Sequence, residues 1–458
     1  MNLHSQSDTI VALSTGQGIA AISMIRMSGA KAIEIADKMF KGEILEHAAS
    51  HTLHYGRIEN EKEEHLDDVV IGLYRAPKSY TTEDIVEISC HGSPFIVKEI
   101  LELIIRQGAR PADPGEFTMR AFLNGRMDLS QAEAVADLIE SQTKASHRIA
   151  VQQLRGGVST EIQVLRKKLL DFVSLIELEL DFGEEDVEFA NREKLNELVW
   201  EVIRMIALLK KTFELGNAIK AGIPTVIAGR PNAGKSTLLN KLLKEERAIV
   251  SAIPGTTRDT IEEALVINGI QYRLIDTAGI REAHDEIEVI GIARTMEKIE
   301  QAAILIYVFD VTSISPSDVL RDMGVIQPAN AKVILAANKM DLRPYVDPAE
   351  YAVDGMTVIP MSALNSMNIP YLVDTLAELV RKDIPENATI ISSARHYHAL
   401  DRAQTRLLAV VEGLEKGVTH DFLAQDIRQA MYHLGEITGE ISTEDVLGNI
   451  FGRFCIGK

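Results

Sequence analysis

The stretch Gly229-Arg-Pro-Asn-Ala-Gly-Lys-Ser236 fits the phosphate-loop pattern G-x-x-x-x-G-K-[ST] and decides the fold of the middle of the chain. A largely apolar run, Ile223 to Ala228, leads directly into it. The glycines let backbone N–H groups turn inward around phosphates, Lys235 reaches the β- and γ-phosphates, and Ser236 offers a hydroxyl to Mg²⁺. The helix expected from Thr237 places the positive end of its dipole at the anion. The stretch predicts a nucleoside triphosphate site, and the alternative is a glycine turn with an exposed lysine.

A second motif predicts which base is bound. The apolar run Val333 to Ala337 ends in Asn338-Lys339-Met340-Asp341, the N-K-x-D signature of guanine recognition. The carboxylate of Asp341 can accept hydrogen bonds from N1–H and from the 2-amino group of guanine. Adenine offers neither donor there, and an unpaired buried charge costs a few kcal/mol. We therefore expect GTP and GDP as the ligands.

Three further segments complete a Ras-like set in the expected order. Leu274 to Gly279 ends in D-x-x-G, where Asp276 orients the Mg²⁺ shell and the Gly279 N–H meets the γ-phosphate. Gly255-Thr-Thr-Arg-Asp259 supplies the hydroxyls of a first switch loop, with Thr257 on Mg²⁺, and Val358 to Leu364 resembles the loop behind the guanine ring. The predicted nucleotide contacts are Asn232, Ala233, Gly234, Lys235, Ser236, Thr237, Ser251, Thr256, Thr257, Asp276, Thr277, Ala278, Gly279, Asn338, Lys339, Asp341, Ser362 and Ala363.

The residue after D-x-x-G bears on the mechanism of hydrolysis. Ras-like switches place a glutamine there to orient the attacking water, and this chain has Ile280, which cannot do so. The missing group is then a cation or arginine supplied to the phosphates, or a carboxylate of the second switch, Arg281 to Glu288. A run this acidic is also typical of a solvated loop.

Composition limits the remaining choices. The chain has 458 residues, 46% hydrophobic and 25% charged, which is ordinary for about three globular domains. No apolar stretch approaches a membrane span and no cationic leader opens the sequence, so we expect a cytoplasmic protein without a membrane partner. Two cysteines, Cys90 and Cys455, are too few for a disulfide framework. The net charge of −19 argues against a generic nucleic-acid binder, although a local basic patch could hold a folded RNA.

Periodicity predicts a multidomain architecture. Residues 1–117 mix strands (9–13, 19–25, 69–74, 85–89) with helices (31–40, 96–107) and form an α+β domain. Residues 118–221 and 381–458 carry helical patterns (129–154, 161–180, 192–219, 398–415, 422–434, 443–451) and form one all-α domain. The α/β P-loop GTPase domain, residues 222–380, is inserted between these two parts, since a domain with adjacent termini can be inserted with little strain.

Motifs outside the GTPase segment carry a resemblance to a known family. They are Tyr80-Thr-Thr-Glu-Asp84, Cys90-His-Gly-Ser-Pro94, Pro114-Gly-Glu-Phe-Thr118, Arg120-Ala-Phe-Leu-Asn124, Asp128-Leu-Ser-Gln-Ala-Glu-Ala134 and Phe454-Cys-Ile-Gly-Lys458. From Asp8 to Lys458 the chain resembles the bacterial tRNA-modification GTPase MnmE (TrmE) family. The resemblance implies a homodimer that works with the flavoprotein MnmG, as a heterotetramer, in a C5 aminomethyl-type (carboxymethylaminomethyl) modification of the wobble uridine of tRNA. It also implies 5-formyltetrahydrofolate or a related tetrahydrofolate as the one-carbon donor.

The same resemblance implies roles for particular residues. Family folate contacts fall on Arg26, Glu83, Arg126 and Lys458, and position 126 is usually lysine in relatives. The K⁺-dependent hydrolysis of the family maps onto Asn232, Ser251, Ile253 and Thr256. Its catalytic carboxylate falls on Glu288, which would also fill the gap left by Ile280. The tail residue Cys455 is a candidate for covalent chemistry or, equally, for a structural role.

Two other functions stay open. One is an RNA- or ribosome-binding GTPase switch without a part in modification chemistry, which would call for an RNA-binding module after the GTPase segment; the sequence after Asp383 has no G-x-x-G loop of the KH type. The other is a folate-dependent group-transfer enzyme in which GTP binding is incidental. The intact N-K-x-D motif beside both switch motifs argues against it.

Overall fold

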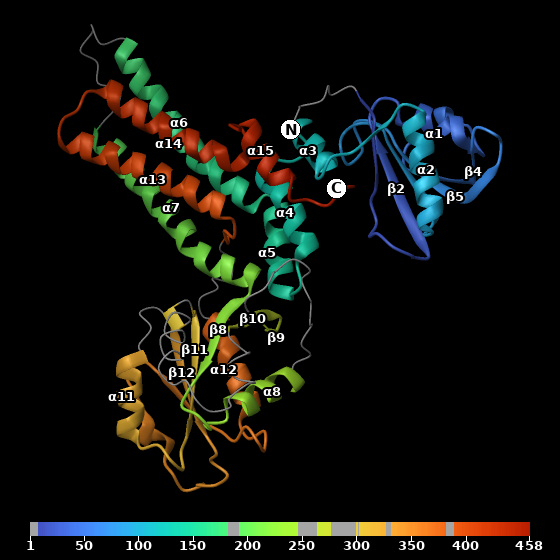
Figure 1. Ribbon diagram of the computed structural model, residues 1–458. Helices are drawn as coiled ribbons and strands as arrows, with labels where there is room; N and C mark the ends of the chain where they lie inside the picture. The colour runs from blue at the N-terminus through green and yellow to red at the C-terminus, as the bar shows by residue number, and fades with distance from the viewer. Residues whose placement is uncertain are drawn as a thin grey trace. The chain divides into compact units, whose positions relative to one another are not determined.

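The computed structural model describes residues 8–181, 192–245, 263–275, 299–300, 302–326, 331–381 and 389–458 (Figure 1). The chain forms two compact units. The first comprises Met1–Ile139, Gln153–Val199 and Arg402–Lys458, and the second Glu140–Gln152 and Trp200–Asp401. Each unit is described by itself.

A seven-stranded sheet forms the N-terminal part of the first unit, in the order β3-β4-β5-β6-β2-β1-β7. Its strands are β1 (Ile10–Leu13), β2 (Ile22–Ser28), β3 (Phe40–Lys41), β4 (Thr52–Glu59), β5 (His65–Tyr74), β6 (Ile85–His91) and β7 (Arg110–Pro111). Neighbouring strands are antiparallel except β1 and β7. Helices α1 (Ala32–Met39) and α2 (Pro94–Arg106) share a buried core with Val69, Ile71 and Leu73. The alternate residue Val70 is exposed, so the other face of the sheet is open.

The predicted elements of this domain are largely confirmed. All six are present: three match to within two residues at each end, the helix at 96–107 begins two residues earlier, the strand at 69–74 begins four residues earlier, at His65, and the strand expected at 19–25 begins only at Ile22. The residues before it, 14–21, form bends instead, although Ala20 N–H still donates to Gly92 O beside strand β6. Strands β3, β4 and β7 and helix α3 (Glu116–Leu123) were not predicted.

The helices within residues 129–221 and 394–451 follow the predicted amphipathic patterns. They are α4 (Leu129–Glu140), α5 (Lys144–Leu154), α6 (Gly157–Asp181), α7 (Arg192–Ala221), α13 (Ala394–Glu415), α14 (His420–Thr438) and α15 (Glu444–Phe451). In the first unit α14 packs along α6 and α15 contacts α3. The single helix predicted over 129–154 is wrong, because the pattern is divided into α4 and α5. The hydroxyl of Thr143 accepts from Ser146 N–H and starts α5 anew.

The second unit contains a six-stranded sheet in the order β13-β12-β11-β8-β10-β9. Its strands are β8 (Ile223–Ala228), β9 (Glu263–Ile267), β10 (Ile270–Ile275), β11 (Ile304–Asp310), β12 (Lys332–Asn338) and β13 (Thr357–Pro360). All pairs are parallel except the hairpin of β9 and β10. Every residue of β11 is buried, as expected for a central strand covered on both faces.

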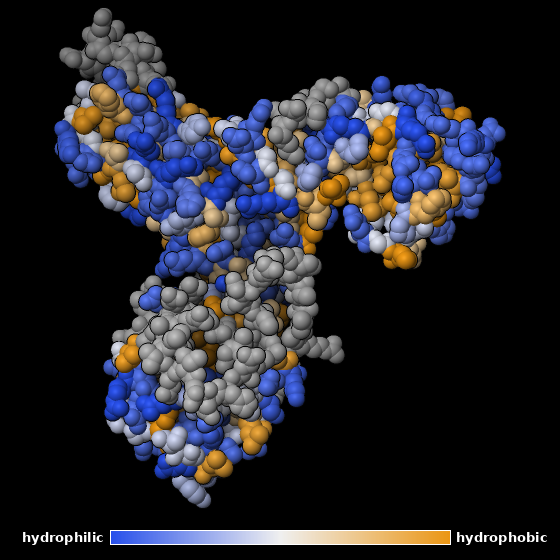
Figure 2. Space-filling view, in the orientation of Figure 1, coloured by the Kyte–Doolittle hydropathy of each residue, from blue (hydrophilic) through white to orange (hydrophobic). Residues whose placement is uncertain are grey.

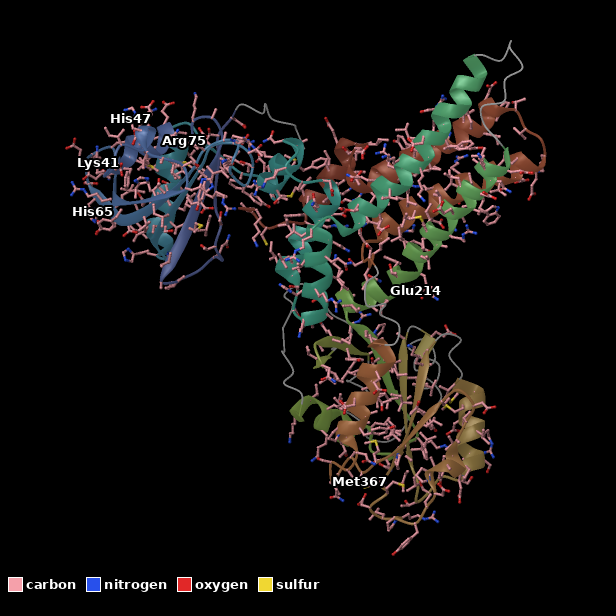
Figure 3. All side chains as sticks on the ribbon, turned by 180° about the vertical axis from the view of Figure 1, so that it is seen from behind. Lys41, His47, His65, Arg75, Glu214 and Met367 are labelled. Atoms are coloured by element: carbon pink, nitrogen blue, oxygen red, sulfur yellow. The ribbon has the colours of Figure 1, made fainter. Side chains whose placement is uncertain are left out.

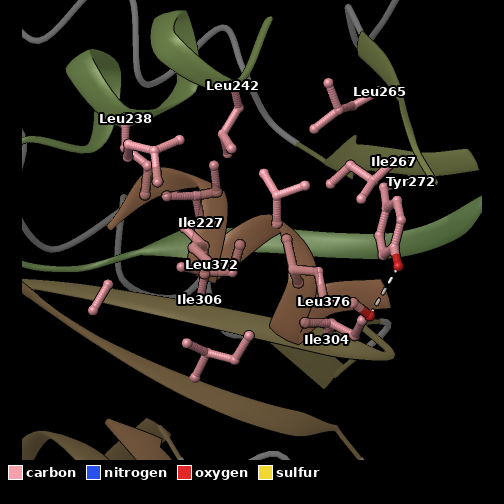
Figure 4. Close-up of a cluster of buried hydrophobic side chains, with 14 of the residues drawn as sticks. Ile227, Leu238, Leu242, Leu265, Ile267, Tyr272, Ile304, Ile306, Leu372 and Leu376 are labelled. Carbon is pink, nitrogen blue, oxygen red and sulfur yellow. Dashed lines mark hydrogen bonds between the residues drawn. The ribbon is translucent and has the colours of Figure 1, made fainter. Parts of the chain in front are cut away.

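Helices cover both faces of this sheet. On one face, α8 (Lys235–Glu245) and α12 (Ile369–Arg381) pack Leu238, Leu242 and Leu372 against the sheet, and Tyr272 OH donates to the Leu376 carbonyl at 2.9 Å (Figure 4). On the other face, α11 (Pro316–Ile326) contributes Val319 to a second core.

The protein is therefore multidomain, with an α+β N-terminal domain, an all-α helical domain and an inserted α/β P-loop GTPase domain. The compact units group the helical sequence differently from the finer division at 117, 221 and 380, and that division stays a prediction.

Candidate functional site

The backbone of the phosphate loop, between β8 and α8, has positive φ angles at three positions that favour glycine or asparagine. Gly229 has φ +148°, and a Cβ there would lie 2.0 Å from the carbonyl oxygen of Val308. Gly234 has φ +99°, and a Cβ there would lie 2.2 Å from Nδ2 of Asn338. Asn232 adopts the left-handed conformation, φ +59°, which asparagine tolerates better than most residues. The glycines of the motif are thus required by close backbone approach as well as by the turn.

Lys235, the first residue of α8, is held inside this loop. Its Nζ donates to the carbonyl oxygens of Gly229 at 2.8 Å and of Arg230 at 2.9 Å. Burial lowers the pKa of the ammonium, because two neutral acceptors compensate for lost hydration less well than an anion does. Phosphate oxygens would supply the missing negative charge, which is the chemistry predicted for this lysine. The neighbouring Ser236 and Thr237 lie in the first turn of α8.

The guanine loop is bonded to the phosphate loop. Asn338, the last residue of β12, donates from Nδ2 to the Ala233 carbonyl at 2.7 Å and accepts from Ala363 N–H at 2.9 Å. Asn338, Ala233 and Ala363 are all buried. The sequence predicts that Asn338 contacts the nucleotide. The structure shows that its side chain also links its own loop to the loops that contain Ala233 and Ala363. Asp341, the predicted base reader, is exposed two residues beyond Lys339.

Lys339 has a partner that sequence reasoning missed. Its Nζ lies 2.7 Å from Oδ2 of Asp310, and its backbone is left-handed with φ +65°. Burial acts to raise the pKa of Asp310, but hydrogen bonds from Lys339 and Thr312 outweigh it and lower the pKa. The position of Asp310 could have predicted this contact, because Asp310 ends the strand next to β12 and so lies at the same edge of the sheet as Lys339.

The loop behind the predicted base site is closed by backbone bonding. Ser362 and Met367 exchange hydrogen bonds, from Met367 N–H at 3.0 Å and from Ser362 N–H at 3.2 Å, and Figure 3 marks Met367. Ser362 and Ala363 are buried at the end of β13. The first phosphate-side residues and the base-side residues are therefore brought together at the carboxyl ends of parallel strands, where α/β sheets bind ligands.

The rest of the predicted GTPase site lies outside the described residues. This part comprises Ser251, Ile253, Thr256, Thr257, Asp276, Thr277, Ala278, Gly279 and Glu288, with Ile280. It includes Thr257 of the Mg²⁺ pair and three of the four K⁺ positions. Among the residues that the structure does describe, no group of three His, Cys, Asp or Glu side chains could hold a metal ion.

In the N-terminal domain, Arg26 on β2 lies between a carboxylate and two rings. Its Nε donates to Glu87 at 2.8 Å, and its guanidinium carbon lies 5.8 Å from the ring centroids of both Tyr80 and Phe117. These cation–π contacts add to the ion pair. The guanidinium is thus held in place on the sheet rather than free at the surface.

Glu83 is held by a buried arginine that sequence reasoning did not single out. Ser28 Oγ donates to Glu83 Oε2 at 2.6 Å, and Arg120 Nη1 lies 3.2 Å from both carboxylate oxygens. Arg120 also donates to Asp8 at 2.6 Å and to Glu116 at 3.0 Å. Arg120 belongs to the Arg120–Asn124 motif, so that motif orients the predicted folate contact.

Arg110 completes this network, which contains three carboxylates and two guanidiniums. Arg110 donates to Asp8 at 2.7 Å and to Glu116 at 2.6 Å. Burial acts to raise the pKa of Asp8 and of Glu116, but hydrogen bonds from Arg110, with charge and further bonds from Arg120, outweigh it and lower both. One negative charge is left over in this network. The shortest distance to a guanidinium nitrogen is 3.2 Å for Glu83 but 2.6 Å for both Asp8 and Glu116. Glu83 is therefore the carboxylate best able to accept from a ligand.

A cavity of about 450 Å³ borders these residues. It is lined by His51, Tyr74, Pro77, Lys78, Ser79, Tyr80 and Arg126. Arg126 donates to the carbonyl of Ser79, whose hydroxyl in turn donates to the carbonyl of Glu83. The structure thus places two predicted folate residues, Glu83 and Arg126, on either side of one serine.

The tail with Lys458 lies against the same sheet. Ser14 Oγ donates to the Gly457 carbonyl at 3.1 Å, and a Cβ on Gly457, φ +94°, would lie 2.2 Å from the carbonyl oxygen of Leu13. Leu13 pairs with Ile25, next to Arg26, so the tail reaches the strands that carry a predicted folate contact. Cys455 in this tail is exposed, whereas Cys90 is buried, and burial with nearby Asp67 raises the pKa of Cys90 to about 11.

Two family models match the chain, and together they cover nearly all of it. A model described as the GTP-binding protein TrmE N-terminus matches residues 9–126, and one described as the MnmE helical domain matches residues 129–455. The chain belongs to the MnmE (TrmE) family. The protein of Cytophaga hutchinsonii named tRNA modification GTPase MnmE is 52% identical over 456 residues, covering 99% of this chain and 98% of its own length. That of Christiangramia forsetii, with the same name, is 48% identical over 472 residues and 99% of both chains.

Family membership fixes the enzyme class. With the phosphate and guanine loops in place, this MnmE-family chain is a GTP hydrolase. Among solved structures, the G domain of the T. maritima FeoB iron transporter is 27% identical, covers 34% of this chain and 97% of its own, and has a TM-score of 0.27. A TM-score of this size adds nothing to the family assignment. No helix in the described part of the chain is long and apolar enough to cross a membrane.

Proposed function

We propose that this GTPase acts in the cytoplasm with an MnmG-type flavoprotein to install a carboxymethylaminomethyl-type group on C5 of the wobble uridine of tRNA. A tetrahydrofolate such as 5-formyltetrahydrofolate supplies the one-carbon unit. GTP hydrolysis depends on Mg²⁺ and on K⁺. Its relatives are named tRNA modification GTPases, and that name supports tRNA as the substrate.

The folate part of the proposal is carried by the N-terminal cavity. Its volume of about 450 Å³ lies within the range for sites that enclose a small organic ligand. Tyr80 offers an aromatic wall for a flat ring. Glu83 belongs to a network with one more carboxylate than guanidiniums, and Arg120 contacts it at 3.2 Å. A pterin presents N–H donors that a carboxylate accepts, and cations such as Arg126 pair with the carboxylates of its glutamate.

Hydrolysis is proposed to use a cation in place of the absent glutamine. Asn232 would contribute its side chain to K⁺ beside the phosphates, together with Ser251, Ile253 and Thr256 of the first switch. Glu288 would orient the attacking water. Lys235 balances phosphate charge, and Ser236 with Thr257 would hold Mg²⁺, which neutralises the developing charge when bound.

The open face of the N-terminal sheet supports a homodimer. Ile22, Leu53 and Tyr55 are between 64% and 74% exposed. Strand register places them with Val70 on one face, because Tyr55 pairs with Val70, Val70 with Ser89 and Ser89 with Met24. Figure 2 shows apolar side chains gathered on this domain. A row of exposed apolar side chains across neighbouring strands is typical of a protein interface.

Mass spectrometry of tRNA wobble nucleosides tests the function directly. Cells lacking this gene should lose the C5-modified uridine and regain it with the wild-type gene. Complementation with Glu83→Gln separates the folate function from GTP hydrolysis. Loss of the modified uridine with unchanged GTP turnover supports the folate role of Glu83. Unaltered nucleosides in the deletion strain would overturn the proposal and favour an RNA- or ribosome-binding switch.

A further inference from the structure

The residues that line the cavity of the N-terminal domain differ in burial: Ser79 and Tyr80 are the more buried and are called its inner end, and the exposed Lys78 and His51 are called its outer end. At the inner end Tyr80 carries Arg26 over its ring, and Ser79 is bonded to Glu83. At the outer end lie Lys78 and His51, and the His51 ring meets Tyr74 edge-on at 5.4 Å between centroids. The residues proposed to hold the folate ring account for the inner end and leave the outer end without a role.

The outer end is rich in cations that carboxylates do not neutralise. Lys78 is exposed and forms no ion pair within the part of the chain that the structure describes. Arg75, three residues before it and labelled in Figure 3, is not among the residues that line the cavity. Its guanidinium donates to the backbone carbonyls of Leu45 at 3.1 Å, Glu46 at 2.7 Å and Ala48 at 3.1 Å.

The Arg126 side chain likewise donates to a backbone carbonyl, that of Ser79. The residues that line the cavity include two cations, Lys78 and Arg126, and no carboxylate. Positive charge thus exceeds negative charge at this rim, on a chain whose net charge is −19.

The volume of the cavity indicates which part of a folate can reach these cations. A hollow of about 450 Å³ that is open to solvent has room for a pterin with its aminobenzoyl group, and the glutamate end of the folate then extends toward the exposed side. Any additional γ-linked glutamates must lie across the rim. Each of them adds one carboxylate, and Lys78 is a flexible point charge that can pair with whichever comes within reach.

We propose that Lys78, supported by Arg75 and His51, binds the polyglutamate tail of the folate and makes the site selective for polyglutamylated over monoglutamylated folates. This inference rests on the proposed folate function of the cavity. Exposed ion pairs are weak, so each should contribute about a two- to fivefold gain in affinity. Two added glutamates should therefore increase affinity by roughly tenfold, and the increase should shrink at high salt.

Calorimetric titration of the full chain tests this with 5-formyltetrahydrofolate in its mono- and triglutamate forms, at low and high salt. We compare the wild type with Lys78→Ala and with Lys98→Ala, an exposed lysine on α2 that does not line the cavity. Lys78→Ala should keep the monoglutamate affinity and lose most of the triglutamate gain, while Lys98→Ala should match the wild type.

Three results would overturn the proposal. Equal affinity of the wild type for both folate forms, or a triglutamate gain that survives Lys78→Ala, removes the rim from folate recognition while leaving the folate function intact. Binding of neither form by the wild type instead removes the folate function and this inference with it.

Discussion

Asn338 donates a hydrogen bond of 2.7 Å from Nδ2 to the carbonyl oxygen of Ala233, which joins the guanine loop to the phosphate loop. The other end of the same carboxamide accepts from Ala363 N–H at 2.9 Å. Because all three residues are buried, neither bond is replaced by water when it breaks. Contacts to the base and to the phosphates are thus mechanically coupled through one side chain.

Replacing this side chain should weaken nucleotide binding. Asn338→Asp has nearly the same shape but no Nδ2 donor, and it sets a carboxylate against the Ala233 carbonyl. An unsatisfied buried group costs about 1 to 3 kcal/mol, so the affinity for GDP should fall by roughly 5- to 150-fold. Fluorescent GDP titration measures it, with the exposed Asn365→Asp as control. A wild-type affinity in Asn338→Asp would contradict the coupling.

The cation prediction concerns Asn232. GTP turnover should be much faster in KCl than in NaCl at equal ionic strength, because K⁺ would provide the charge that other GTPases take from an arginine. Asn232→Ala should remove most of the difference. Asn232→Gly is the sharper variant, since glycine accepts the left-handed φ of +59° without strain and only the carboxamide is lost. Equal rates of the wild type in the two salts would eliminate the mechanism.

Glu288, which lies outside the described residues, is predicted to orient the attacking water. Glu288→Ala should retain nucleotide affinity and lose roughly two to four decades of hydrolysis rate, as is typical for a single acid–base group. Single-turnover kinetics with saturating enzyme separate the chemical step from binding. Hydrolysis at the parent rate would shift the assignment to Asp285 or Glu286, which should be mutated in parallel.

The buried charges around Arg120 predict a pH dependence of stability. The pKa values of Asp8 and Glu116 are lowered from 3.8 and 4.5, so their contribution is complete above those values and is lost as the pH falls through the lower, folded-state pKa values. Arg120→Met leaves the carboxylates without that partner and should destabilise the domain by about 3 to 5 kcal/mol at pH 7.

The loss should become smaller on acidification, because protonated carboxyls no longer need the arginine. Urea unfolding at pH 7 and at about pH 2.5 measures it, with Arg57→Met as the control, since the Arg57 side chain is 57% exposed in its pair with Glu59. A loss that is independent of pH would mean that packing, not charge, is what Arg120 provides.

Local patterns were predictable and distant pairings were not. The phosphate and guanine motifs are contiguous, and each was placed at a strand end because an apolar run precedes it. Strand β11 was missed although all of it is buried, since a short apolar run carries no period that separates strand from helix. Arg120 and Glu83 are 37 residues apart, and nothing in either motif encodes that they meet. The break between α4 and α5 is caused by the cap that Thr143 provides, and the pattern of apolar residues continues across it. Periodicity alone therefore does not reveal the break.

The hydrogen bond between Ser14 and Gly457 joins residues 443 positions apart and so constrains the order of folding. In an unstructured chain, the length-dependent entropy of closing such a loop costs about 5 kcal/mol, several times the worth of one hydrogen bond. We therefore expect the contact to form after α14 has packed on α6 and α15 on α3, because these contacts shorten the segment still to be closed. Docking of the tail is thus a late event of maturation, and an antibody or chemical probe specific for a released tail would count the molecules that have not yet completed it.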